Sequence, residues 1–272
     1  MKFSVLICVY ERENPDYLKQ ALKSVLDQTL MPDEIVLVKD GALTAGLNEI
    51  ISGFEQENPG LFKIIPIEEN VGLGKALATG VENCAYELVA RMDSDDVADP
   101  ERFKKQVEFM KANPDTDVVG SFISEFSESP EYIYAYRKLP VKHEDIYKFG
   151  KWRCPMNHMT VIFRKASVLN AGNYSDLRKM QDFELWGRML NKGYKFANIP
   201  ENLVNVRGGK IFSAKRQGAE YFFSYEMQVQ IKFLKNRFIN IREFLRNVSL
   251  KFLLRIIPVS MREFIYGRFL RG

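Results

Sequence analysis

Residues 87–96 read ELVARMDSDD, and this stretch decides how the rest of the chain is interpreted. Its first half, Leu88 to Met92, is a short apolar run with one arginine, which predicts a strand buried in a sheet. Its second half places three carboxylates, Asp93, Asp95 and Asp96, within four residues. Like charges this close disfavour one another's ionisation unless a cation offsets them. Because Mg²⁺ and Mn²⁺ prefer carboxylate oxygens, the stretch predicts a metal site at a strand end.

The alternative for this stretch is an acidic turn that caps the next helix. Asp99, directly before Pro100, fits a helix N-cap, but the three earlier carboxylates are more than a cap requires. An EF-hand loop is excluded, because it would need Asp or Asn at position 97, Gly at 98 and Glu at 104. The metal-site interpretation is therefore kept.

The composition is typical of a globular protein with a large core. The chain has 272 residues, of which 46% are apolar, which predicts one large domain or one domain with a C-terminal extension. Its three cysteines are scattered without zinc or disulfide spacing, so a reducing cytoplasm is expected. The apolar N-terminus stops at Glu11 and is interpreted as a strand, and the absence of a run of about 18 apolar residues predicts no transmembrane helix.

Strands and helices alternate in the first hundred residues. The expected order is strand 3–9, helix 15–28, strand 34–38, helix 45–56, strand 61–67, helix 75–83 and strand 88–92. This alternation predicts a parallel sheet covered on both faces, with all its carboxyl ends at one edge. Tyr10-Glu11, Asp40, Asn70 and the acidic cluster follow these strands, so one cleft collects them. No GxGxxG follows the first strand, which argues against dinucleotide binding.

The order becomes mixed after the acidic cluster. We expect a helix from Asp99-Pro100 to Lys111, a strand over 117–122, antiparallel strands within 123–141, a strand entered at Thr160, a helix over 180–191, and short strands over 195–199 and 203–206. Tyr132, Tyr134 and Tyr136 alternate in the antiparallel part.

An ordered set of short motifs resembles a known family. The motifs are Tyr10-Glu11, Lys39-Asp40-Gly41, Asn70-Val71-Gly72, the stretch 92–96 and the segment 181–186 (QDFELW). Together they resemble the family 2 inverting glycosyltransferases with the GT-A fold, over about residues 1–210. The segment 154–164 (CPMNHMTVIFR) resembles bacterial exopolysaccharide enzymes of the amylovoran-biosynthesis type. The resemblance implies an α/β fold with a mixed, mostly parallel central sheet flanked by helices, a catalytic domain over 1–215 and a helical extension over 216–272.

The resemblance also implies roles for individual residues. Asp40 corresponds to the aspartate that binds the uracil ring of the donor, and Tyr10 to an aromatic residue near the base. Asp93 and Asp95 correspond to the DxD motif, with Asp95 the stronger metal candidate. Asp182 corresponds to the general base. The family usually has Glu-Asp where this chain has Gln181-Asp182, a departure that touches the neighbour and not the base.

Further candidates come from their place at the cleft. We assign Glu11, Asn70, Lys75 and Arg207 to the nucleotide-sugar site, although a surface role for Arg207 is equally compatible with the sequence. His158 is weighed evenly between a structural role and a contact to the metal or the pyrophosphate.

The implied activity is metal-dependent transfer of a sugar from a nucleotide donor, expected to be UDP-linked, to a lipid-linked oligosaccharide. The cofactor is expected to be Mn²⁺ or Mg²⁺, and the setting is surface polysaccharide biosynthesis at the cytoplasmic face of the membrane. One alternative is a sugar-nucleotide pyrophosphorylase, whose Gly-rich, basic segment after the first strand is absent here. Another is a non-catalytic sugar-nucleotide or membrane adaptor, against which the intact Asp93, Asp95 and Asp182 argue.

The C-terminal segment 228–272 is strongly basic, whereas the rest of the chain is mildly acidic. Ten Lys or Arg and two acidic residues give it a net charge of +8, which leaves −4 for residues 1–227. Basic and aromatic residues alternate in a helical pattern, which predicts a peripheral contact with the membrane surface. The alternative is a helical appendage packed on the catalytic domain. Nucleic-acid binding fits the charge but has no supporting motif.

Overall fold

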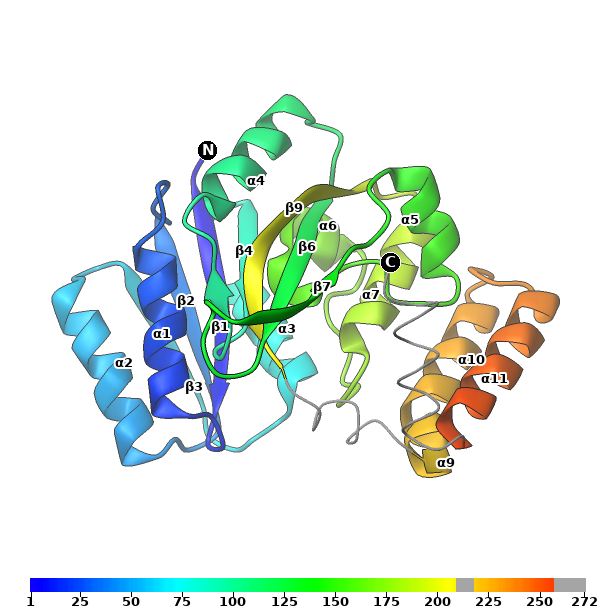
Figure 1. Cartoon of the computed structure of the whole chain (residues 1–272), viewed down its shortest axis with the longest axis horizontal. Coiled ribbons are helices and arrows are strands. Elements are labelled where there is room, and N and C mark those ends of the chain that lie inside the picture. Colours follow the sequence, from blue (N-terminus) through cyan, green and yellow to red (C-terminus); the bar gives the residue numbers. More distant parts are fainter. Residues whose placement is uncertain (209–217, 257–272) are drawn as a thin grey trace.

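The computed structural model describes residues 1–208 and 218–256. Its first half consists of four parallel strands and three helices (Figure 1). The strands are β1 (Phe3–Tyr10), β2 (Glu34–Asp40), β3 (Phe62–Ile67) and β4 (Leu88–Met92), and the helices are α1 (Pro15–Leu26), α2 (Ala45–Glu57) and α3 (Leu73–Asn83). The strand order β3-β2-β1-β4 with parallel pairing confirms the predicted α/β alternation.

The second half extends the same sheet with mixed directions. Its elements are β5 (Val97–Ala98), α4 (Arg102–Ala112), β6 (Val118–Phe126), β7 (Ile133–Arg137), α5 (His143–Gly150), a 3₁₀ turn (His158–Thr160), β8 (Ile162–Arg164), α6 (Lys165–Asn170), α7 (Gln181–Asn191) and β9 (Phe196–Arg207). The order continues β4-β8-β6-β9-β5. β8 runs antiparallel to both β4 and β6, β6 and β9 are parallel, and β7 pairs antiparallel with β6.

Three sequence expectations were wrong in detail. The two short strands over 195–206 form one strand, β9, whose pairing with β6 shifts register instead of ending. The strand expected at Thr160 begins two residues later, because Thr160 ends a 3₁₀ turn. Helix α4 begins at Arg102, and Asp99 supports its first turn by accepting the N–H of Glu101 at 3.0 Å.

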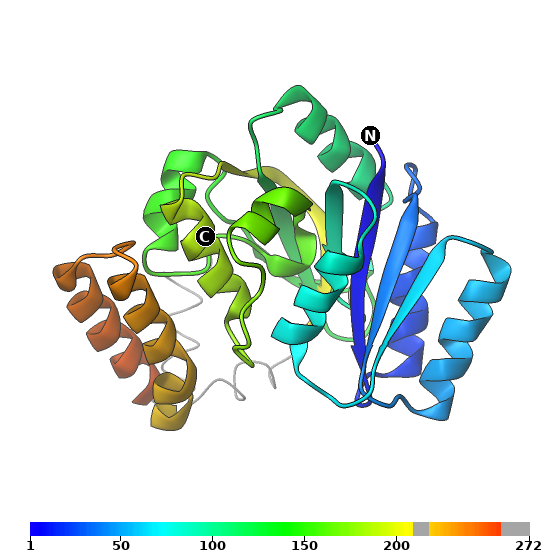
Figure 2. The ribbon, with the colours of Figure 1, turned by 180° about the vertical axis from the view of Figure 1, so that it is seen from behind.

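Two hydrophobic cores lie on the two faces of the sheet. One contains Leu18 and Leu22 of α1 and Phe103 of α4, with residues of α2. The other contains Leu77 of α3 and Trp186 of α7, with residues of α6. Helices α1 and α2 lie in front of the sheet in Figure 1, and the opposite face, with α3 and α6, is in front in Figure 2.

The predicted C-terminal extension is helical over its described part. It comprises α9 (Gly218–Tyr221), a π-helical turn (Phe222–Glu226), α10 (Met227–Lys235) and α11 (Ile241–Ile256). Phe233 of α10 packs edge-on against Phe183 of α7, with ring centroids 5.0 Å apart, and shares its core. The division into domains at residue 215 stays a prediction, and the expectations for residues 257–272 lie outside the described residues. None of the described helices is both long and apolar enough to span a membrane.

Candidate functional site

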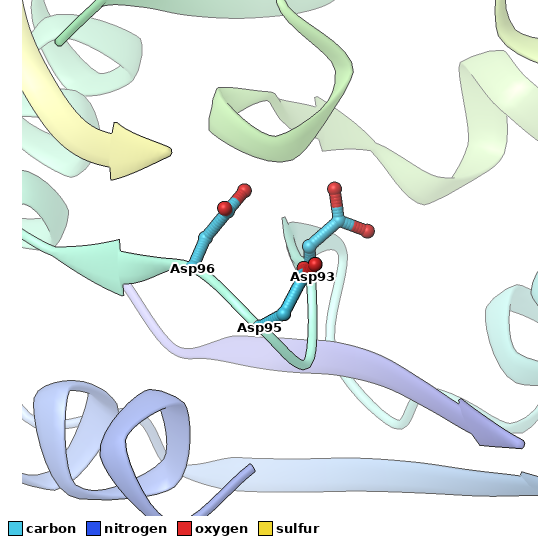
Figure 3. Close-up of side chains that lie close together, drawn as sticks. All are labelled: Asp93, Asp95 and Asp96. Carbon is cyan, nitrogen blue, oxygen red and sulfur yellow. The ribbon is translucent and has the colours of Figure 1, made fainter. Parts of the chain in front are cut away.

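The loop after β4 brings the three predicted carboxylates together (Figure 3). Asp93, Asp95 and Asp96 each offer an oxygen, and these atoms lie within 4.8 Å of one another. In the described part of the chain, this is the one group of three or more potential metal-ligating side chains of His, Cys, Asp and Glu. The prediction from spacing alone therefore corresponds to a cluster with the dimensions of a metal site.

The electrostatics of this cluster favour a cation. Burial, followed by the charges of Asp93 and Glu13, raises the pKa of Asp95 to about 7. Burial and the charges of Asp93 and Asp95 raise the pKa of Asp96 well above its usual value. Asp96 accepts the backbone N–H of Arg207 with Oδ1 at 2.8 Å, whereas its buried Oδ2 has no hydrogen-bond partner among residues 1–208 and 218–256. Since hard cations take carboxylate oxygens, these residues fit Mn²⁺ or Mg²⁺.

Two buried arginines lie beneath the cluster. Arg91, which is 3% exposed, forms an ion pair with Asp93, and Arg102 donates to the carbonyl oxygen of Arg91 at 2.6 Å. The Nε and Nη1 atoms of Arg91 have no hydrogen-bond partner within the described residues. Arg91 pairs with Asp93 alone, so Asp95 and Asp96 have no salt-bridge partner within the described residues. The partner of Asp93 was foreseeable, since residues 91 and 93 are two apart and alternate residues of a strand share a face.

The donor-site candidates of the first three strands gather around Asp40. The Asp40 carboxylate accepts the N–H groups of Val71 and Gly72 at 2.8 and 3.1 Å and the side-chain amide of Asn70 at 3.1 Å. Tyr10, which is 43% exposed, pairs with Asp40 in the sheet register. Asp40 therefore holds the predicted turn beside the exposed ring of Tyr10.

Glu11 and Lys75 are exposed at the same edge of the sheet. Glu11 follows β1 and pairs with Arg12 at 3.7 Å, whereas Lys75 lies in the first turn of α3. Neither side chain is buried, so both are accessible from solvent.

Arg207, the last residue of β9, contacts the acidic loop directly. Its Nε donates to the carbonyl oxygen of Asp95 at 3.2 Å, in addition to the backbone bond to Asp96. The guanidinium group lies 3.8 Å from the ring centroid of Tyr17. The structure thus gives Arg207 an anchoring role for the acidic loop, which the sequence did not indicate.

His158 lies in an aromatic environment. Its Nε2 is 2.9 Å from the hydroxyl oxygen of Tyr174, and its ring packs against Trp186 with centroids 6.1 Å apart. Burial, with the charge of Arg91, lowers the pKa of His158 well below its usual value, so the ring is neutral. A metal contact would have to use Nδ1, because Nε2 is engaged.

Asp182 lies in the first turn of α7, after a residue in an unusual conformation. Met180 has φ of 62°, the left-handed region that non-glycine residues rarely adopt and that clusters at functional sites. The Sγ of Cys154 lies 3.5 Å from Oδ2 of Asp182. Burial and the charge of Asp182 raise the pKa of Cys154 well above its usual value, so Cys154 is a thiol. Its S–H faces both this carboxylate and the carbonyl oxygen of Met156, which lies 3.3 Å from the sulfur.

Tyr174 connects the two acidic groups electrostatically. Burial raises its pKa, Arg91 lowers it, and the charges of Asp182 and Asp93 both raise it. Its hydroxyl group therefore lies within electrostatic reach of the predicted base and of the acidic cluster. Neither Tyr174 nor Cys154 was assigned a role from sequence, because their contacts join segments far apart in the chain.

Comparison with known proteins places this site in a family. The family model described as glycosyl transferase family 2 matches residues 4–170. The chain is 38% identical over 274 residues to the amylovoran biosynthesis glycosyltransferase AmsE of Erwinia amylovora, covering 99% of this chain and 100% of the relative. It is 33% identical over 270 residues to the UDP-Gal:alpha-D-GlcNAc-diphosphoundecaprenol beta-1,3-galactosyltransferase of Escherichia coli, covering 99% of this chain and 97% of that one.

Solved structures show the same fold. S. aureus TarS 1–349 in complex with UDP-GlcNAc superposes with a TM-score of 0.68 at 19% identity, covering 99% of this chain and 76% of that one. The mannosyltransferase PcManGT of Pyrobaculum calidifontis, in complex with GDP-Man and Mn²⁺, superposes with a TM-score of 0.64 at 15% identity, covering 92% of this chain and 69% of that one. These likenesses confirm the predicted GT-A fold. The chain therefore belongs to glycosyltransferase family 2 and is a glycosyltransferase.

Proposed function

We propose that the chain moves a hexose from a UDP-linked donor to a lipid-linked saccharide with inversion at the anomeric carbon. The observation that carries this proposal is the cluster of three carboxylates, with Oδ2 of Asp96 lacking a hydrogen-bond partner within the described residues, at the sheet edge that also presents Asp40. A relative is named for UDP-Gal and a diphosphoundecaprenol-linked sugar, and a structural neighbour was solved with UDP-GlcNAc. A second neighbour holds Mn²⁺ with its nucleotide sugar.

The cation would be held by Asp95 and Asp93, with Oδ2 of Asp96 as a further oxygen. A divalent ion there supplies positive charge that offsets the negative charge developing on the leaving nucleoside diphosphate. Arg91 fixes the position of Asp93 from below, and Arg207 fixes the loop from the side. His158 remains a candidate ligand only through Nδ1.

Asp182 acts as the general base in this proposal. Because the thiol of Cys154 lies beside Oδ2, Oδ1 is the oxygen left to accept the proton of the acceptor hydroxyl group. A positioned base of this kind contributes about 10²–10⁴-fold in rate. Inversion requires this base to lie on the side of the sugar ring opposite the leaving nucleotide.

The donor base would lie against Tyr10, with Asp40 as its hydrogen-bond acceptor. A carboxylate has about four acceptor positions, of which the Asn70–Gly72 turn uses three, so one remains for the uracil ring. Asn70 orients Asp40, and Lys75, Glu11 and Arg207 line the same edge, with Lys75 suited to a phosphate group.

Thermal melting with UDP, GDP, CDP and ADP, each with and without Mn²⁺, tests the donor and the metal together. A ligand at 100 times its Kd stabilises a protein by about 2.7 kcal/mol, which is a shift of several degrees for a domain of this size. We expect the shift with UDP only when Mn²⁺ is present, and its loss in Asp95→Ala but not in the exposed control Asp115→Ala. The absence of a shift with every nucleotide in the wild type would contradict the proposed donor site.

We further propose that the extension contacts the inner face of the plasma membrane. Helix α11 exposes Ile241, Leu245 and Leu253, which are 56%, 58% and 55% exposed, beside the exposed basic residues Arg242 and Arg246. Each basic residue near an anionic leaflet contributes about 1 kcal/mol. Co-sedimentation with phosphatidylglycerol vesicles should exceed that with phosphatidylcholine vesicles and fall in Ile241→Ser/Leu245→Ser. Equal recovery of the protein with both vesicle types would indicate that the extension only packs on the catalytic domain and does not bind the membrane.

A further inference from the structure

Strand β7 exposes a row of tyrosines that the proposed chemistry leaves without a role. Tyr134 and Tyr136 are 50% and 52% exposed, and Tyr132, directly before the strand, is 70% exposed. In the sheet, β7 pairs with β6 and lies off the main strand order (Figure 1). Large aromatic side chains that protrude together from a strand form a flat surface of alternating apolar faces and hydroxyl groups.

The strand register shows which face of the sheet carries these rings. Ile123 of β6 belongs to the core with α1 and α4 and pairs with Arg137, whereas Ser124 pairs with Tyr136. Paired residues of antiparallel strands share a face, and neighbours along a strand alternate. Tyr136 therefore lies on the opposite face, which is the side of the sheet on which α7 packs. The pairing shifts register at Tyr134, between the pairs Glu125–Ala135 and Phe126–Ile133.

One end of the tyrosine row lies beside the strand that holds the acidic loop. A Cβ added at Gly208 would lie 2.8 Å from the hydroxyl oxygen of Tyr134, so this hydroxyl group reaches the backbone just after β9. The preceding residue, Arg207, bonds to Asp95 and Asp96.

The chain that follows β7 is hydrogen-bonded, through Asn198, to the segment next to Asp182, the proposed general base. The side-chain amide of Asn198 donates to the carbonyl oxygens of both Pro140 and Pro155, at 2.7 and 3.2 Å. Pro155 follows Cys154, whose sulfur lies 3.5 Å from Oδ2 of Asp182. The tyrosine row thus lies between a residue next to Arg207, which bonds to the acidic loop, and a chain segment tied to Pro155, next to Cys154.

We propose that Tyr134 and Tyr136 form the binding platform for the acceptor saccharide, with Tyr132 extending it outward. Alternate residues of a strand are about 6.6–6.8 Å apart, so neighbouring rings can each stack on a sugar ring. Tyrosine suits a neutral carbohydrate because its ring covers C–H groups while its hydroxyl group bonds to sugar hydroxyls. This inference rests on the proposed function, and it gives the acceptor a position continuous with both Asp182 and the metal cluster.

The first test separates acceptor binding from donor binding in kinetics. Initial rates are measured with UDP-Gal, Mn²⁺ and a GlcNAc-α-diphospho-lipid of varied concentration, for the wild type, Tyr134→Ala, Tyr136→Ala and Tyr136→Phe. We expect each alanine variant to raise the acceptor KM about tenfold, the equivalent of 1.4 kcal/mol, and Tyr136→Phe to raise it far less. The donor KM and the melting shift with UDP and Mn²⁺ should not change. The control Tyr86→Ala removes a half-buried ring two residues before β4, at the amino end of that central strand.

The second test does not depend on turnover. Saturation-transfer NMR with the phenyl ester of GlcNAc-α-1-phosphate should show contact between the sugar and the wild-type protein, lost in Tyr134→Ala/Tyr136→Ala and retained in Tyr86→Ala. The proposal is overturned if the wild type shows no contact, if the double variant keeps it, or if the acceptor KM of the double variant changes less than twofold. Failure of the proposed function is recognised separately, by the absence of a UDP–Mn²⁺ melting shift in the wild type.

Discussion

Replacing Asp95 with asparagine is expected to stabilise the metal-free protein at pH 8, although it removes a proposed metal ligand. The pKa of Asp95 is raised from 3.8 to about 7, chiefly by burial. The folded protein therefore holds this proton more tightly than the unfolded chain does. The contribution of Asp95 to stability is highest below about pH 4, falls as the pH rises through 7, and is then constant.

The size of this stability change follows from the difference between the pKa of Asp95 in the unfolded chain and in the folded protein. The interval from 3.8 to about 7 corresponds to about 4 kcal/mol at 1.36 kcal/mol per pH unit. Asp95 is partly exposed, and solvent screening reduces the cost of its charge, so we expect a gain of about 2–4 kcal/mol for Asp95→Asn at pH 8.

Urea unfolding in EDTA at pH 8 and pH 5 measures this gain. The advantage of Asp95→Asn should shrink by more than half at pH 5, where the folded wild type keeps the proton. Saturating Mn²⁺ at 100 times its Kd should restore about 2.7 kcal/mol to the wild type alone. Asp115→Asn, an exposed aspartate on another loop, serves as control and should change little. A variant no more stable than the wild type at pH 8, or an advantage equal at both pH values, would refute the reasoning.

Substitutions at three further residues test the proposed base, its neighbouring thiol and the donor site. Asp182→Asn should lower kcat by about 10²–10⁴-fold and leave the UDP–Mn²⁺ melting shift intact, and a retained rate would exclude Asp182 as the base. Cys154→Ala removes the thiol beside Asp182 and should lower kcat severalfold with an unchanged donor KM. Cys154→Ser should recover most of the lost rate, and equal rates in both variants would show that the contact has no role in positioning Asp182. Asp40→Ala leaves the Val71 and Gly72 N–H groups without their acceptor and should lower the free energy of unfolding in urea by about 1–3 kcal/mol. The same variant should lose the melting shift with UDP. A variant with wild-type UDP affinity would exclude Asp40 from the donor site.

The first half of the fold was predictable because each buried parallel strand is a continuous apolar run. The runs 3–9, 34–38 and 88–92 carry this pattern, and turn residues separate them from the helices. The acidic cluster was predictable for a related reason, since its members lie within four residues and need no tertiary information to be brought together.

The second half was less accessible because its structure depends on long-range pairing. Pro200 and Glu201 interrupt the apolar pattern of β9 and suggested two strands, yet the parallel partner β6 holds one strand through a register shift. The contact between Cys154 and Asp182 joins residues 28 positions apart, and no spacing rule links a thiol to a carboxylate at that separation. Arg207 was placed near the cleft by its strand, but its bonds to the acidic loop cross 112 positions.

The position of β8 has a consequence for how the enzyme is made. This three-residue strand lies between β4, which carries the acidic cluster, and β6, which leads toward the saccharide platform. Until residues 162–164 have left the ribosome, β4 is an open sheet edge, and open edges pair with other chains. Pairings between distant segments are also slow to form. The donor half can therefore fold during synthesis, whereas β4 joins the second half of the sheet only after β8 has been made. A nascent or truncated chain that ends before β8 keeps this edge open and is therefore expected to aggregate more readily than the full chain.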